Sequence, residues 1–179
     1  MRTHLASAVL HKWAIADRRG AEDVKIRDVM NTKAARIRLG QPMALAAETL
    51  VLTDAGDLMV LDDDDRFIGV LAGGDLLHAI MPDFEGLMEA GASLRRACEI
   101  FVRAGDDYAD EPIDRLVIHG SITVSGDDEL LKAATVMITM GIRLLAVVDD
   151  GRLLGTVSRA DVCWGVLVEQ PSRRAVAPD

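Results

Sequence analysis

Two copies of one short motif, 86 residues apart, organise this chain of 179 residues. The first copy is GVLAGGD at residues 69–75, and the second is GTVSRAD at residues 155–161. In each copy an apolar strand follows a glycine, turns, and places an aspartate in the first turn of an amphipathic helix. The constant spacing indicates that the chain contains a duplicated unit.

The residues around each copy predict the same β-α-β-β-α order of elements. The predicted strands are residues 37–39, 58–61 and 67–71 in the first repeat and 122–124, 144–148 and 153–157 in the second. Pro42 begins the first inner helix, where its missing N–H costs nothing, and Pro82 ends the helix that closes the first repeat. Each repeat is too small to cover its own sheet. We therefore expect an α+β fold in which the two repeats pack about a pseudo-two-fold axis.

Helices are expected outside the repeats as well. Apolar residues at helical spacing within residues 4–17, among them Leu5, Val9 and Trp13, predict an N-terminal helix. Between the repeats, Ser93 can cap a helix whose apolar stripe includes Phe101. The expected organisation is an N-terminal helix (1–21), repeat 1 (22–80), a helical insert (81–111), repeat 2 (112–170) and a flexible tail (171–179).

Charge and composition exclude several classes of protein. The formal net charge of −9 argues against a nucleic-acid surface, which requires clustered Lys and Arg. No apolar run reaches the roughly 20 residues that a membrane span needs. Cys98 and Cys163 lie within apolar helical patterns without metal-ligand spacing, so we expect buried free thiols in a reducing cytoplasm rather than a disulfide.

The duplicated pattern resembles a tandem pair of CBS domains, named after cystathionine β-synthase. The residues that carry the resemblance are GIRLLAVVDDGRLLGTVSRADV at 141–162 and, more weakly, GDLMVLDDDDRFIGVLAGGDLL at 56–77. The resemblance implies a stand-alone module whose clefts bind an adenosine-containing molecule such as AMP, ADP, ATP or S-adenosylmethionine. It also implies a homodimer that regulates a partner protein.

The second copy of the motif supplies the leading site residues. Ser158 and Asp161 form an S-x-x-D pattern at a helix start, which can be a capping box of about 1 kcal/mol. The same carboxylate can instead accept both ribose hydroxyls of a nucleotide, while Arg159 and free helix N–H groups meet phosphate oxygens. The two roles compete for Asp161, and we favour the nucleotide role.

Three further residues belong to this predicted site. Arg143 precedes a strand and either reaches the cleft or is a solvated arginine at the strand edge. Thr123 and Val124 match the segment that lines the base pocket in relatives, with ordinary strand packing as the equal alternative.

The first copy departs from the pattern, because Ala72 stands where the family has Ser or Thr. Gly73 and Gly74 offer no cation there. Asp75 is therefore interpreted as a helix-capping carboxylate rather than a ligand group, and we expect one occupied site per chain, the second.

No catalytic constellation, metal-ligand cluster or phosphate-binding glycine loop is recognisable in the sequence. We interpret the chain as a non-enzymatic, ligand-sensing module that requires no cofactor, binds an adenine nucleotide and signals to a separate, unknown protein. We expect no nucleic-acid or membrane partner. The alternative is a structural dimerisation module that has lost ligand binding.

Overall fold

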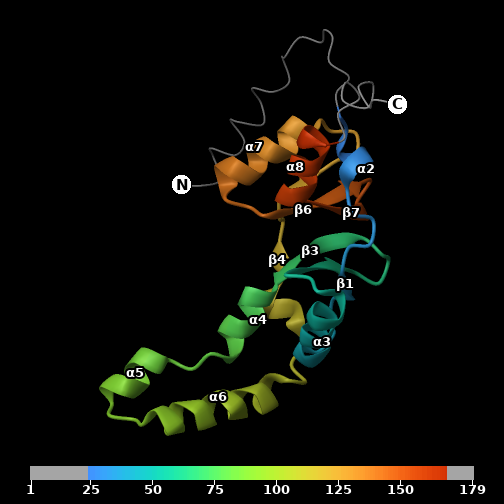
Figure 1. Cartoon of the computed structure of the whole chain (residues 1–179). Coiled ribbons are helices and arrows are strands. Elements are labelled where there is room, and N and C mark those ends of the chain that lie inside the picture. The colour runs from blue at the N-terminus through green and yellow to red at the C-terminus, as the bar shows by residue number, and fades with distance from the viewer. Residues whose placement is uncertain (1–23, 169–179) are drawn as a thin grey trace.

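The computed structural model describes residues 24–168, which form two lobes stacked one above the other (Figure 1). The elements of the first lobe are β1 (Arg36–Arg38), α3 (Met43–Thr53), β2 (Asp57–Leu61), β3 (Phe67–Ala72), α4 (Gly73–Ile80), α5 (Phe84–Glu89), α6 (Leu94–Tyr108), η2 (Ile113–Leu116) and β4 (Ile118–His119). Those of the second lobe are α2 (Ile26–Val29), β5 (Thr123–Val124), α7 (Leu130–Met140), β6 (Leu144–Asp149), β7 (Arg152–Ser158) and α8 (Arg159–Leu167). The predicted N-terminal helix and C-terminal tail lie outside the described residues.

Each lobe contains the predicted hairpin and a short parallel strand beside it. The first sheet has the order β1-β2-β3-β4 and the second β5-β6-β7. β1 runs parallel to β2 and β5 parallel to β6, whereas β2–β3 and β6–β7 are antiparallel. In the second hairpin turn Asp150 and Gly151 both have positive φ, as a two-residue hairpin of this sequence type requires. The prediction of two β-α-β-β-α repeats is confirmed.

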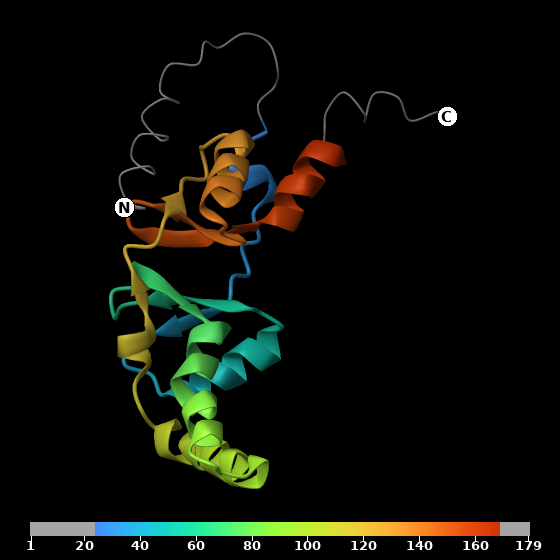
Figure 2. The ribbon, with the colours of Figure 1, turned by 90° about the vertical axis from the view of Figure 1, so that its left-hand side faces the viewer.

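The two sheets face each other, and the helices lie on the outer sides (Figures 1 and 2). The facing sides of the sheets share a small apolar core that includes Met59, Leu61, Ala146 and Leu153. A separate core lies between each sheet and its own helices, centred on residues such as Leu58 and Leu145. The result is four layers in which the sheets form the middle, as expected for repeats that cannot cover their own sheets alone.

The segment that leads into each repeat packs on the other repeat, an exchange that the sequence pattern did not predict. Ile26 of α2 is fully buried in the core of the second lobe, while Ile113 of η2 is fully buried in the core of the first. The chain then crosses between lobes. Asn31 exchanges two backbone hydrogen bonds with Thr156 of β7, at 2.8 and 3.0 Å. On the other side, β4 pairs with β3, with Ile118 opposite Val70.

The inter-repeat insert is helical, as predicted. Ser93 caps α6, and its Oγ accepts a hydrogen bond from the N–H of Arg96 at 3.2 Å. α5 and α6 extend from the end of the first lobe that is farthest from the second lobe (Figures 1 and 2). Within residues 24–168, Cys98 on α6 and Cys163 on α8 are free thiols with exposed side chains, in contrast to the predicted burial. The buried residues of these two helices are instead Ala97 on α6 and Gly165 on α8.

Candidate functional site

The start of α8 carries the S-x-x-D pattern in the geometry of a full capping box. Asp161 Oδ2 accepts hydrogen bonds from the backbone N–H and the hydroxyl of Ser158, both at 2.7 Å. In return, the Ser158 hydroxyl accepts from the N–H of Asp161 at 3.2 Å. Both bonds to the carboxylate go to one oxygen. Among the described residues, Oδ1 has no protein donor, so the carboxylate is held in place with one oxygen available.

Arg159 lies beside this box but is engaged elsewhere. Its Nε donates to the carbonyl of Ile142 at 3.1 Å, and its Nη2 donates to the carbonyl of Met137 at 3.2 Å. These bonds satisfy carbonyl groups at the C-terminal end of α7, where a cation also interacts favourably with the helix dipole. Arg159 therefore stabilises the junction between α7 and α8.

Arg143 faces the other repeat. Its backbone carbonyl accepts from the N–H of Arg159 at 3.2 Å, which ties it to the start of α8. Its guanidinium interacts electrostatically with Asp57, which precedes Leu58 at the start of β2. Asp57 and Arg143 are 86 residues apart and so occupy the same position in the two repeats. A positive and a negative side chain, one from each repeat, thus lie where the two repeats meet.

The carboxylate of Asp75 also interacts electrostatically with Asp57. Burial raises the pKa of the Asp57 carboxyl above its usual value of 3.8, Arg143 lowers it, and Asp75 raises it further. The charges of Asp57, Asp75 and Arg143 therefore influence one another across the junction of the lobes. The sequence alone did not single out Asp57 as a site residue, although an alignment of the two repeats places it at the position equivalent to Arg143.

Asp75 does not show the capping role predicted for it. Its Oδ2 is buried and has no hydrogen-bond partner among the described residues, and Ala72 at the N-cap has no side-chain cap bond. A second buried oxygen, Ser121 Oγ, is also unpaired within residues 24–168. A buried acceptor without a partner costs about 1–3 kcal/mol, so such atoms are candidates for contact with a ligand or water.

Thr123 and Val124 form β5, at the edge of the second sheet. They pair with Ala146 and Val147 of β6. The Val124 side chain is buried in the core of the second lobe, whereas Thr123 is exposed. Strand packing accounts for Val124. Ser121, with its unpaired hydroxyl, lies two residues earlier, in the segment that crosses from the first lobe to the second.

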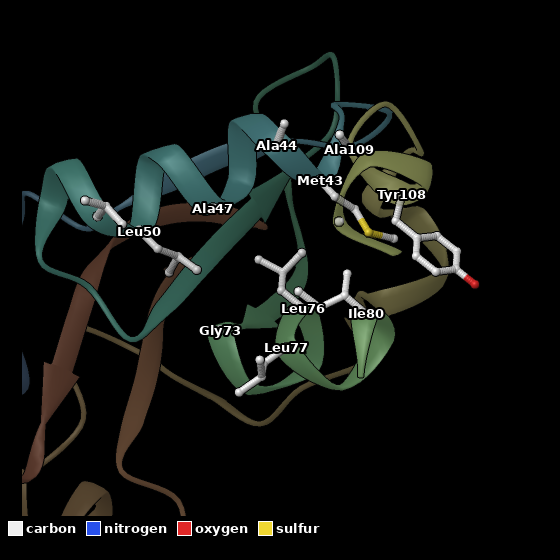
Figure 3. A pocket seen from close by; sticks show the side chains of 12 residues that line it. Met43, Ala44, Ala47, Leu50, Gly73, Leu76, Leu77, Ile80, Tyr108 and Ala109 are labelled. Carbon is white, nitrogen blue, oxygen red and sulfur yellow. The ribbon is translucent and has the colours of Figure 1, made fainter. Parts of the chain in front are cut away.

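An apolar pocket of about 440 Å³ lies on the outer side of the first lobe (Figure 3). Side chains of α3 and α4, including Leu50 and Leu77, line it, and Tyr108 and Ala109 at the end of α6 border it. It lies on the side of the first sheet that faces away from the second lobe, which α3 and α4 cover (Figures 1 and 2).

Residues 24–168 contain no group of three or more His, Cys, Asp or Glu side chains arranged to hold a metal ion. None of the helices in this range combines the length and the apolar character needed to cross a membrane.

The exchanged repeats, the facing sheets and the polar junction define a pair of CBS domains. The family described as CBS domain matches residues 26–82 and 113–166, and the chain belongs to this family. The helical insert lies between the two matched segments.

Solved structures show the same fold. The CBS domain of a CBS domain containing membrane protein from Sphaerobacter thermophilus is 23% identical with a TM-score of 0.63, over 88% of this chain and 95% of that one. CBSX2, solved in complex with AMP, is 23% identical with a TM-score of 0.61, over 80% of this chain and 96% of that one.

A curated relative is much longer. The A-adding tRNA nucleotidyltransferase of Aquifex aeolicus is 23% identical over 143 residues, which are 80% of this chain. The chain spans only 14% of the length of that enzyme. The similarity therefore concerns a part of the enzyme.

Proposed function

We propose that this protein is a regulatory module that binds an adenine nucleotide or a related adenosyl ligand at the junction of its two repeats. The observation that carries the proposal is the capping box at α8, which fixes the Asp161 carboxylate and leaves Oδ1 available. A fixed carboxylate is suited to accept hydrogen bonds from ribose hydroxyls. The AMP complex of CBSX2, which has the same fold, supports this choice of ligand.

Arg143 is the better candidate for a phosphate contact. Its side chain is exposed, and its guanidinium donates no hydrogen bond within the described residues. The guanidinium of Arg159, by contrast, would have to leave two carbonyl groups to reach a phosphate. We assign Arg143 to the phosphate and Arg159 to the support of α8. Thr123 remains a candidate for the base pocket, and Asp75 for a weaker, first site.

Binding would act on a separate protein. Since both repeats contribute to the junction, a ligand there would change how the lobes lie against each other and hence the surface offered to a partner. We place this activity in a homodimer in the reducing cytoplasm, where free thiols such as Cys98 persist.

Calorimetric titration of the full chain with AMP, ADP, ATP and S-adenosylmethionine tests the proposal. We expect at least one of these to bind, Asp161→Asn to abolish that binding, and Asp75→Asn to affect it little. Absence of heat with all four ligands at millimolar concentration would refute the sensing function.

A structural dimerisation module is the second candidate. It is favoured by exposed apolar side chains on the outer helices of the first lobe, since Val51 and Leu52 are 80% and 76% exposed and Leu77 is 53% exposed. Such a surface is typical of a protein–protein contact. A stable dimer in sedimentation analysis, combined with no response to any of the four ligands, would favour this candidate.

A further inference from the structure

The second lobe exposes an apolar surface, here termed the α7–α8 face, made of Leu131, Ile138, Cys163 and Val166. Leu131 and Ile138 are seven residues apart on one side of α7 and are 58% and 77% exposed. On α8, Cys163 is exposed and Val166 is 47% exposed. Exposed apolar side chains on two helices that contact each other indicate a surface that another element covers.

The corresponding surface of the first lobe is partly covered by its own chain. Tyr108 and Ala109, at the end of α6, border the apolar pocket between α3 and α4 (Figure 3). The chain then follows the start of α3. There the N–H of Ala44 donates to the carbonyl of Ala109 at 3.0 Å, and the N–H of Met43 donates to the carbonyl of Glu111 at 2.9 Å. The helix that precedes η2 is thereby held against α3 and α4.

In the second lobe, the segment that leads into α2 follows the same course along α7, from Val24, the first described residue. The N–H of Leu130 donates to the carbonyl of Val24 at 3.0 Å, in the same way that Met43 donates to Glu111. The N–H of Ile26 donates to the carbonyl of Asp128 at 3.0 Å, as Ile113 donates to Gln41 on the first lobe. The two helix starts therefore receive their leading segments in the same manner. Val24 therefore lies at the start of α7 as Glu111 lies at the start of α3.

We propose that residues 4–17 of the same chain cover the α7–α8 face, as the end of α6 borders the pocket between α3 and α4. This segment has the required pattern, because Leu5, Val9 and Trp13 recur every four residues. The linker of residues 18–23 reaches at most about 20 Å when extended, which keeps the segment close to α7. The arrangement leaves the outer helices of the first lobe as the surface open to a second copy or a partner.

The reactivity of Cys163 tests this proposal in the full chain. Cys98→Ser leaves Cys163 as the remaining thiol, and its rate of labelling by a maleimide reports whether the α7–α8 face is covered. The reference for an exposed thiol is the labelling of Cys98 in a Cys163→Ser protein. We expect Cys163 to react at least roughly tenfold more slowly than this reference, since a covered thiol reacts only after local opening.

Substitutions in the segment identify what covers the face. Val9→Asp with Trp13→Asp places charges on the apolar stripe and should restore rapid labelling, whereas His11→Asp, on the other side of the predicted helix, should leave Cys163 protected. Circular dichroism of each variant verifies that the two lobes remain folded. Rapid labelling of Cys163 in the unsubstituted segment would overturn the proposal. Protection that disappears on dilution would also overturn it, because a second copy would then cover the face.

Discussion

Gly155 of β7 lies directly against the backbone carbonyl of Asn31, and a Cβ on Gly155 would overlap that oxygen. Gly69 stands in the same relation to the carbonyl of Ile118. The glycine that begins each copy of the motif is thus required by the exchanged segment that crosses over it. The two glycines that organise the sequence are the points at which the repeats hold each other's leading segments.

Gly155→Ala should destabilise the protein by about 1–3 kcal/mol, because the methyl group meets backbone that cannot move aside without disturbing the Asn31–Thr156 hydrogen bonds. Gly74→Ala is the matched control, since an added Cβ at this position in the first turn of α4 has no neighbour within 4 Å. It should be neutral or stabilising by about 0.5–1 kcal/mol. Urea unfolding measures both, and equal effects would contradict the close approach at Gly155.

Substitutions of the two capping-box residues should have different effects on stability and on ligand binding. Ser158→Ala removes the hydroxyl that bonds both the carboxylate and the N–H of Asp161, and we expect a loss of about 1 kcal/mol. Asp161→Asn keeps an oxygen that accepts from the Ser158 N–H, so its effect on stability should be smaller. Its effect on the affinity for an adenosyl ligand should be the larger of the two. Thermal unfolding and calorimetry on the same samples would show this reversal, and unchanged affinity in Asp161→Asn would remove the carboxylate from the ribose site.

Asp57 predicts a specific dependence of stability on pH. Burial and Asp75 raise the pKa of its carboxyl in the folded protein, with Arg143 opposing them, so the folded state retains this proton to a higher pH than the unfolded state. The free energy of unfolding therefore decreases as pH rises from about 3.8 to the raised pKa of the folded protein. Above that range the lost stability is not regained.

Asp57→Asn should remove this contribution. Relative to the wild type, the variant should gain stability as pH rises from about 3.8 through the raised pKa of Asp57, because the proton then leaves the wild-type protein. Urea unfolding across this range measures the difference, and Asp63→Asn, in the exposed β2–β3 turn, is the control for removal of one negative charge. A difference between wild type and Asp57→Asn that does not vary with pH would contradict the environment described for Asp57.

The two arginines near α8 should differ in their effects. Arg159→Ala removes the bonds to Met137 and Ile142 and should cost about 1 kcal/mol of stability, and Arg159→Lys should not restore it, since an ammonium cannot reproduce the two-atom contact. Arg143→Ala should weaken the binding of AMP more than that of adenosine. The ratio of the AMP and adenosine affinities, measured by calorimetry for each variant, distinguishes the roles. If the ratio changed in Arg159→Ala and not in Arg143→Ala, Arg159 would be the phosphate contact and our assignment of Arg143 would be wrong.

Local sequence signals predicted most of the fold. The hairpins follow from apolar runs separated by Asp62–Asp65 and by Asp150-Gly151, and the glycine at position 141 adopts the left-handed conformation expected at the end of α7. The capping box at Ser158, which the sequence offered as the alternative to a nucleotide role for Asp161, is formed. These features depend on residues close together in the chain, so pattern and spacing are sufficient to identify them.

What the sequence did not predict depends on contacts between distant residues. Nothing in residues 24–31 indicates that Ile26 packs on the second lobe, because either lobe offers an apolar core. The partners of Arg159 are likewise set by the way α7 and α8 meet. The unpaired oxygen of Asp75 results from the absence of a hydroxyl at Ala72 together with burial, and burial becomes visible only in three dimensions. The roles of Asp161, Arg143 and Thr123 toward a ligand remain predictions.

The exchange of leading segments also constrains how the protein forms during synthesis. α2 packs against α8, which is translated more than a hundred residues later, and Asn31 pairs with Thr156. A nascent chain that ends after the first repeat therefore lacks both the second-lobe core that receives α2 and the η2–β4 segment that completes the first sheet. The first lobe has all its elements once β4 has left the ribosome, whereas α2 and the second-lobe core must await the emergence of β7 and α8.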